Sequence, residues 1–226
     1  MASGAESRLE KMILSGELKI GDQLPTERQL AELLGVSRGV VHAGIAELAG
    51  KGFLRIAPRH GVYVADYIKN GTLDVLNSIA LCGSGEIDRE LAGSIIWTRF
   101  ALEYLPVTEL AAHHTDEQIK RLEMMLGEMR AKIKRGDESS GELAERIQEF
   151  FLERCVMYGN LVLPIIVNAS SGISTVLTKK WIEAVGADRA VGALESTMKR
   201  IAEGDPEGAA ASMRRNITSA FEALEK

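Results

Sequence analysis

The apolar residues of the first fifty positions recur with a helical period, and polar and glycine residues interrupt them. Thr26 with Gln29 forms a capping box that predicts a helix start, and Gly35 predicts its end in a left-handed residue. Ser37 can cap the helix that follows. This second helix has apolar residues at the i, i+4, i+7 spacing of a buried face, namely Val41, Ile45 and Leu48. A short helix and a tight turn before a helix with an exposed polar N-terminal face are typical of the DNA-reading helix-turn-helix.

Two β-rich stretches come after these helices. Residues 53–57 and 61–65 flank the loop Pro58-Arg59-His60, which predicts a hairpin with Arg59 and His60 at its tip. Helices followed by such a hairpin form a winged helix. A winged helix that contacts protein instead of DNA remains an alternative, but arginines on the outward helix face (Arg38) and on the hairpin favour DNA.

Strand signals end near Gly71, and the remaining sequence has a helical period. Capping and breaking residues predict helices at 87–113, 142–158, 162–184, 189–203 and 206–225, and one more that begins after Thr115. Pro106 is expected to kink or divide the first of them. The expected fold class is mainly α. Residues 1–66 would form a winged helix-turn-helix with three helices and a β-hairpin wing, and residues 67–226 an all-helical bundle of about six to seven helices.

Composition adds three limits to this picture. An apolar fraction of 46% and a charged fraction of 26% are those of an ordinary soluble protein, and the net charge is −5. Up to Ile68 the chain holds 8 basic and 8 acidic residues, so the excess acidity lies in the remainder, and a neutral DNA reader favours two copies. Two cysteines without CxxC spacing and no secretory signal indicate a reduced, cytoplasmic protein.

The uncharged residues 155–178 favour a buried helix over a membrane span, because small polar residues and a proline interrupt them.

The first 65 positions resemble the GntR family of bacterial transcription regulators. The matching pieces are Gly16-Glu17-Leu18, Gly21, Leu24-Pro25-Thr26-Glu27-Arg28, Leu34-Gly35-Val36-Ser37-Arg38, Leu48, Gly52 and Gly61-Val62-Tyr63-Val64. The second part resembles the helical effector domain of the FadR subgroup. Its matching pieces are Arg99, Glu103, Leu110-Ala111-Ala112, Thr115, Tyr158-Gly159-Asn160, Gly204-Asp205 and Met213-Arg214-Arg215. The resemblance implies a homodimeric regulator whose helical domain binds a small metabolite and thereby changes the spacing of the two winged helices.

Candidate DNA contacts follow from the resemblance, position by position. The helix-turn-helix candidates are Arg28, Ser37, Arg38, Gly39, Val40 and His42, and the wing candidates are Arg59, His60 and Gly61. Arginine can bind guanine or phosphate through two hydrogen bonds, which agrees with these roles. Position 42 usually holds arginine in this family, so His42 predicts an operator other than the family's commonest one, or weaker binding.

The resemblance also raises the question of a metal, because many helical domains of this subgroup hold a divalent cation through one Asp and three His. The corresponding positions are Ile147, Phe151, Leu194 and Asn216, so neither a metal nor another cofactor is expected. His113 and His114 are adjacent on a helix and diverge, which disfavours a shared metal.

The same substitutions predict an apolar effector pocket at Ile147, Phe151, Leu194 and Asn216. Arg99 would be its anion partner, or would form a structural salt bridge with Glu103. An acyl-CoA or another apolar ligand would suit such a pocket, although the C-terminal segment expected to meet acyl-CoA is not kept. A simpler alternative is that these side chains only fill the core.

The function expected is therefore a sequence-specific regulator that binds a palindromic DNA operator as a homodimer and senses a small molecule. Two alternatives remain: a regulator that responds to a metal-bound carboxylate, and a winged-helix module for protein interaction without an effector. No nucleophile–base pair or phosphate loop supports an enzyme, and no membrane partner is expected.

Overall fold

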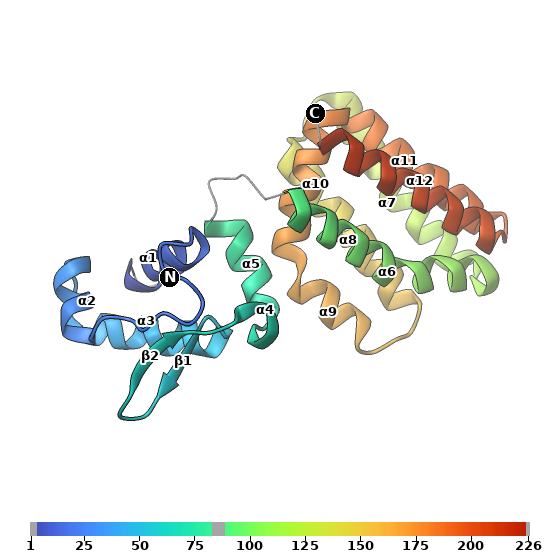
Figure 1. Ribbon diagram of the computed structural model, residues 1–226. Coiled ribbons are helices and arrows are strands. Elements are labelled where there is room, and N and C mark those ends of the chain that lie inside the picture. Colours follow the sequence, from blue (N-terminus) through green and yellow to red (C-terminus); the bar gives the residue numbers. More distant parts are fainter. Residues whose placement is uncertain (1–3, 83–88, 225–226) are drawn as a thin grey trace. The chain divides into compact units, whose positions relative to one another are not determined.

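The structure, a computed structural model, describes the backbone of residues 4–82 and 89–224 and the side chains of residues 4–79 and 90–222. The chain divides into two compact units, Met1–Ile87 and Asp88–Lys226 (Figure 1). Each unit has its own hydrophobic core.

The first unit contains five helices and one hairpin among its described residues. They are α1 (Gly4–Leu14), α2 (Glu27–Leu34), α3 (Arg38–Lys51), β1 (Leu54–Ala57), β2 (Gly61–Val64), α4 (Tyr67–Asn70) and α5 (Leu73–Cys82). The strands are antiparallel, with Leu54 opposite Val64 and Ala57 opposite Gly61. Figure 1 shows the hairpin extending away from the end of α3, as the wing of a winged helix does. The expected winged helix-turn-helix is therefore confirmed.

Local sequence signals explain the turn between α2 and α3. Thr26 and Gln29 complete the predicted capping box, and Gly35 ends α2 at φ 67°, in the left-handed region that favours glycine. Ser37 caps α3 by accepting a hydrogen bond from the Val40 backbone N–H. The three residues of the predicted inward face, Val41, Ile45 and Leu48, are buried. Burial of that face leaves the opposite, N-terminal face of α3 exposed.

The boundary between the units differs from the expected one at residues 66 and 67. Helices α4 and α5 belong to the first unit, because Val75 is buried in its core and Tyr67 and Ile79 pack against the same core. The Thr72 backbone N–H also donates to the Lys51 carbonyl, 3.0 Å away, at the end of α3. The first unit therefore includes two further helices, formed by residues that the sequence pattern assigned to the helical domain.

The second unit is all-helical in its described residues. Its helices are α6 (Arg89–His113), α7 (Asp116–Arg135), α8 (Ser140–Met157), α9 (Leu163–Ala169), α10 (Ser171–Val185), α11 (Ala187–Ala202) and α12 (Pro206–Leu224). In this bundle α6 packs along α12, α12 along α11 and α11 along α7, while α8 packs on α10 (Figure 1). Seven helices between residues 89 and 224 confirm the expected bundle.

Two helices of this unit differ from their predicted form. Pro106 lies inside α6 and does not divide it, which excludes one of its two expected effects, and burial of its ring in the bundle offsets the missing hydrogen bond. The helix predicted over 162–184 is divided into α9 and α10 at Ser170. The Ser170 hydroxyl donates to the carbonyls of Ile166 and Val167, at 3.0 and 3.2 Å, and so competes for the last backbone acceptors of α9.

The uncharged stretch of residues 155–178 spans the end of α8, all of α9 and the first half of α10. Among the residues that the structure describes, no helix is long and apolar enough to cross a membrane.

Candidate nucleic-acid interface and ligand cavity

The sequence-predicted DNA contacts lie on α2, at the N-terminal end of α3 and at the hairpin tip. Eight of the nine are exposed: Arg28, Ser37, Arg38, Gly39, His42, Arg59, His60 and Gly61. Val40 is half-buried and packs partly on the core of the unit. The N-terminal end of a helix presents free backbone N–H groups and a partial positive charge, which favours phosphate. Arg38, the first residue of α3, adds a full positive charge at this end.

A carboxylate that the sequence analysis had not assigned to the site lies between two of these residues. Glu27, the first residue of α2, has its Oε1 2.8 Å from His42 Nδ1, and its Oε2 accepts a hydrogen bond from Arg38 Nη2 at 3.5 Å. The hydrogen bond with His42, and with it the charge of Arg38, holds the pKa of the Glu27 carboxyl below its ordinary value. Glu27 therefore restrains both side chains through these contacts.

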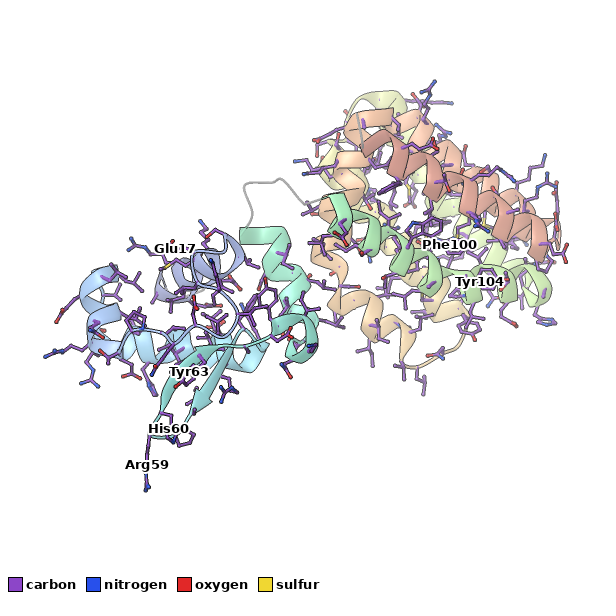
Figure 2. All side chains as sticks on the ribbon, in the orientation of Figure 1. Glu17, Arg59, His60, Tyr63, Phe100 and Tyr104 are labelled. Carbon is purple, nitrogen blue, oxygen red and sulfur yellow. The ribbon has the colours of Figure 1, made fainter. Side chains whose placement is uncertain are left out.

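The hairpin tip is held in place from two sides. Arg59 has φ 67°, which is uncommon for a residue with a side chain, and Gly61 follows at φ 111°. The His60 carbonyl accepts hydrogen bonds from Gln23 Nε2 at 2.8 Å and from the Tyr63 hydroxyl at 3.1 Å. Figure 2 shows Arg59 and His60 at the far end of the hairpin, directed away from the unit. The wing thus presents two side chains that can donate hydrogen bonds, Arg59 and His60, from a turn held by hydrogen bonds.

The second unit contains a cavity of about 100 Å³ among α6, α8, α10, α11 and α12. Four of the five residues predicted for an effector pocket line it: Arg99, Ile147, Leu194 and Asn216. The lining is mostly hydrocarbon, with a polar corner made by Arg99, Glu103, Arg154 and Thr178. The predicted positions therefore converge on one cavity.

The fifth predicted residue, Phe151, is buried beneath that polar corner and does not line the cavity. The guanidinium groups of Arg99 and Arg154 lie 5.1 and 5.9 Å from the centre of its ring. Such cation–π contacts support the two arginines from one side. Phe151 thus positions the polar corner.

Arg99 forms the expected salt bridge with Glu103 and also lines the cavity. Its Nε donates to Glu103 Oε1 at 2.7 Å, and its Nη1 donates to the Thr178 hydroxyl at 2.8 Å. Arg154 donates from Nη2 to the other oxygen of Glu103. Burial would raise the pKa of Glu103, but the charges of Arg154 and Arg99 hold it below its ordinary value, so this carboxyl is ionised.

The residues at the positions of the subgroup's metal site do not fit a divalent cation. Ile147, Phe151 and Leu194 offer only hydrocarbon, and the Asn216 amide group is engaged by the Ala193 carbonyl at 2.6 Å and by neighbouring hydroxyls. His114 Nδ1 lies 2.8 Å from the Leu110 carbonyl, while the adjacent His113 is exposed. Within the described part of the chain, no group of three or more His, Cys, Asp or Glu side chains could hold a metal ion.

Comparison with known families agrees with both units. The family described as "Bacterial regulatory proteins, gntR family" matches residues 1–64, and the FCD domain matches residues 94–219, more than half of the chain. The chain belongs to the GntR family. The FadR-type helical domain expected for this GntR-family chain is thus confirmed as an FCD domain.

Individual relatives are more distant. The HTH-type transcriptional regulator Mce2R of Mycobacterium tuberculosis is 34% identical over 110 residues, 49% of this chain and 45% of that protein. The fatty acid metabolism regulator protein of Shewanella putrefaciens is 33% identical over 115 residues, 47% of this chain and 48% of that protein. The GntR-family chain spans about half the length of the curated relatives it matches. Both relatives are named as regulators, not enzymes.

A solved structure shows the same fold. The structure of Lar, described as controlling expression of the agr system of Listeria monocytogenes, aligns over 98% of this chain and 94% of that chain. The TM-score is 0.68 and the sequence identity is 16%, so this likeness concerns the fold alone.

Sequence reasoning missed three residues that now belong to the candidate sites. Glu27 and Gln23 contact the predicted DNA-binding residues from elements earlier in the chain, and Arg154 reaches the cavity from α8. The charge of Arg154 among the apolar residues that follow it was a usable signal. The partners of Glu27 and Gln23 become visible only when α2, α3 and the hairpin are packed together.

Proposed function

We propose that this GntR-family chain is a sequence-specific, DNA-binding transcription regulator that acts as a homodimer on a palindromic operator. The exposed N-terminal face of α3 beside a hairpin with Arg59 and His60 at its tip carries the proposal. In this arrangement α3 enters the major groove and the wing contacts phosphate or the adjacent groove. Two copies supply two such helices, one for each half-site, which suits a winged helix without excess positive charge.

Each proposed DNA contact has a distinct role. Arg38 reads a base edge or grips a phosphate once it leaves Glu27, and Arg28 contacts the backbone from α2. The free N–H groups near Ser37, Gly39 and Val40 fix the register, while His42 replaces the family's usual arginine with a shorter donor. Arg59, His60 and Gly61 form the contact of the wing.

The decisive experiment is selection of bound duplexes from a random DNA library by the purified full chain, followed by affinity measurements over a range of salt concentrations. We expect a palindrome whose half-sites lie about one helical turn apart, and an affinity that falls steeply with salt. Arg38→Ala should weaken binding to the selected duplex by about 1–3 kcal/mol and relax its specificity. Arg121→Ala, which removes an exposed arginine of the helical unit, is the matched control.

Two results would count against this function. If no sequence is enriched and binding to duplex DNA is indifferent to salt, the winged helix is a protein-interaction module. If Arg38→Ala binds the selected duplex as tightly as the unaltered chain, α3 is not the recognition helix.

We further propose that the cavity of the helical unit binds a small effector with an apolar body. Its mainly hydrocarbon lining supports an apolar ligand, and the relative named as a fatty acid metabolism regulator keeps acyl-CoA among the candidates. A long acyl chain needs more room than about 100 Å³, because an apolar cavity of about 150 Å³ holds a single benzene molecule. A metal-bound carboxylate is disfavoured by the donor set described above.

Thermal melting of the full chain with an acyl-CoA series, and separately with zinc, nickel or EDTA, distinguishes these effectors. A stabilisation that grows with acyl length would favour acyl-CoA. A stabilisation lost in EDTA would instead revive the metal-bound carboxylate.

A further inference from the structure

The polar corner of the cavity contains more positive than negative charge. Arg99, Arg154 and Glu103 are the charged residues among the described residues that line the cavity. Two guanidinium groups share the one carboxylate, because Arg99 donates to one of its oxygens and Arg154 to the other. The side chains of Arg154 and Glu103 are 3% and 7% exposed, so water screens this charge poorly. One unit of positive charge therefore remains uncompensated in a buried site.

An unused donor accompanies this charge. Arg154 Nε is buried and finds no hydrogen-bond acceptor among the described residues. A buried N–H group without an acceptor is uncommon, and a buried charge without full compensation is unfavourable. The unused donor belongs to one of the two arginines that share the carboxylate, and that side chain lines the cavity. A bound anion would remove both deficits at once.

The orientation of the guanidinium groups is restricted on their other side. The Arg154 guanidinium lies 5.0 Å from the centre of the Phe150 ring, and Phe151 supports both arginines. Thr178 further holds Arg99 through its hydroxyl. The donors are thus positioned before any ligand arrives, which reduces the entropy lost on binding.

The rest of the lining limits the kind of anion. Hydrocarbon side chains such as Ile95, Ile147, Leu177 and Leu194 face the remaining space. One charge is available for one negative group, and the body attached to that group must be apolar and small. The volume of about 100 Å³ is smaller than the roughly 150 Å³ that holds a benzene molecule, so it suits a carboxylic acid of about three or four carbons.

We infer that the cavity is a metal-free site for a small monocarboxylate, whose carboxylate binds Arg154 and Arg99 and whose hydrocarbon body fills the apolar part. This inference names the ligand class of the proposed effector cavity, and it rests on the proposed function only in taking that ligand to regulate DNA binding. In the unliganded protein Glu103 acts as an internal counter-ion that occupies part of the arginine pair. The incoming carboxylate supplies the missing negative charge and accepts the free Nε–H of Arg154.

The binding test uses the full chain and a defined set of probes. Calorimetry and thermal melting are carried out with straight-chain carboxylates from acetate to octanoate, with isovalerate and with benzoate, all in the presence of EDTA. The matched neutral probes are butyramide and benzamide, which keep the hydrocarbon body and lose the charge. We expect stabilisation by carboxylates with a maximum at about three or four carbons, less by octanoate and benzoate, and little or none by the amides.

Variants of the polar corner identify the donors. Arg154→Met should lower carboxylate affinity at least about tenfold, because a charge-assisted hydrogen bond is removed. It leaves Glu103 paired with Arg99, so the variant should still fold, which a cooperative melting transition of the unliganded protein would show. Glu103→Gln should change affinity in the opposite direction, since it removes the competing carboxylate. Arg130→Met is the control, because Arg130 forms its ion pairs with Asp188 and Glu195 between α7 and α11, outside the cavity lining.

Three results would overturn the inference: equal stabilisation by butyrate and butyramide, no response to any carboxylate, or unchanged affinity in Arg154→Met. Binding to the selected DNA duplex is measured on the same samples. Loss of the carboxylate response with intact DNA binding would refute the ligand class and leave the regulator standing. Absence of DNA binding with an intact carboxylate response would refute the proposed regulator and leave the carboxylate site standing.

Discussion

Two of the three glycines of α3, Gly39 and Gly44, allow a sharp test of how the proposed recognition helix is held. Gly44 lies on the buried face of α3 against α1, and a Cβ atom added there would be 3.0 Å from the Glu6 backbone nitrogen and 3.3 Å from its Cα. A Cβ atom added to Gly39 would meet only the Ser37 hydroxyl, at 3.9 Å. The same substitution therefore meets backbone at one position and open space at the other.

The expected free energies follow from this difference. Alanine is better than glycine inside a helix by about 1 kcal/mol, so Gly39→Ala should stabilise α3 by up to that amount. At Gly44 the same gain is opposed by displacement of α1, and overpacking of this kind costs about 1–3 kcal/mol. Gly44→Ala should therefore leave the stability of the unit unchanged or lower it by up to about 2 kcal/mol. The Gly44→Ala variant should then be less stable than the Gly39→Ala variant by roughly 1–3 kcal/mol.

Amide hydrogen exchange of the full chain, followed in peptides from α3, measures this difference in the first unit alone. A change of about 1.4 kcal/mol in opening free energy alters exchange tenfold, so the two variants should separate clearly. DNA affinity is measured in parallel, because Gly39 lies on the proposed DNA face. If Gly44→Ala protects α3 as strongly as Gly39→Ala does, the close approach of α1 to α3 is incorrect.

Two further predictions concern the second unit. The pKa of Glu103 is held below its ordinary value in the folded chain, so its contribution to stability is complete above about pH 4.5 and is lost as the pH falls through the lowered pKa. The melting temperature of the unaltered chain should fall more steeply below about pH 4.5 than that of Glu103→Gln, and parallel curves would refute this assignment. Burial raises the pKa of the Cys155 thiol to about 12, so iodoacetamide at pH 8 should alkylate the peptide containing it at least about a hundredfold more slowly in the folded chain than in urea. Equal rates, measured by peptide mass spectrometry, would show that Cys155 is accessible.

The winged helix could be predicted from short-range chemistry. A cap, a left-handed glycine and an apolar spacing each act over three to seven residues, so Thr26, Gly35 and Val41 carried their meaning in the sequence alone. The same logic failed where a side chain or a packing contact overrode the local pattern. The helix predicted over 162–184 is divided at Ser170, whose hydroxyl bonds the last carbonyls of α9, and α6 continues through the buried Pro106.

The candidate sites divide along the same physical line. Family spacing placed Arg99, Ile147, Leu194 and Asn216 at one cavity, because helices of defined length return the same positions to the bundle interior. The partners of those residues required the folded chain. Arg154 meets Glu103 across 51 positions, and no pattern of local spacing encodes that contact.

The sequence was thus sufficient for the family, for the winged helix followed by a helical bundle, and for the faces that carry the candidate sites. Tertiary packing decided where α4 and α5 belong, that Glu27 restrains Arg38 and His42, and that two arginines share one carboxylate in the cavity. Helix signals depend on neighbours within about two turns, whereas charge balance and cavity volume depend on side chains brought together from distant helices.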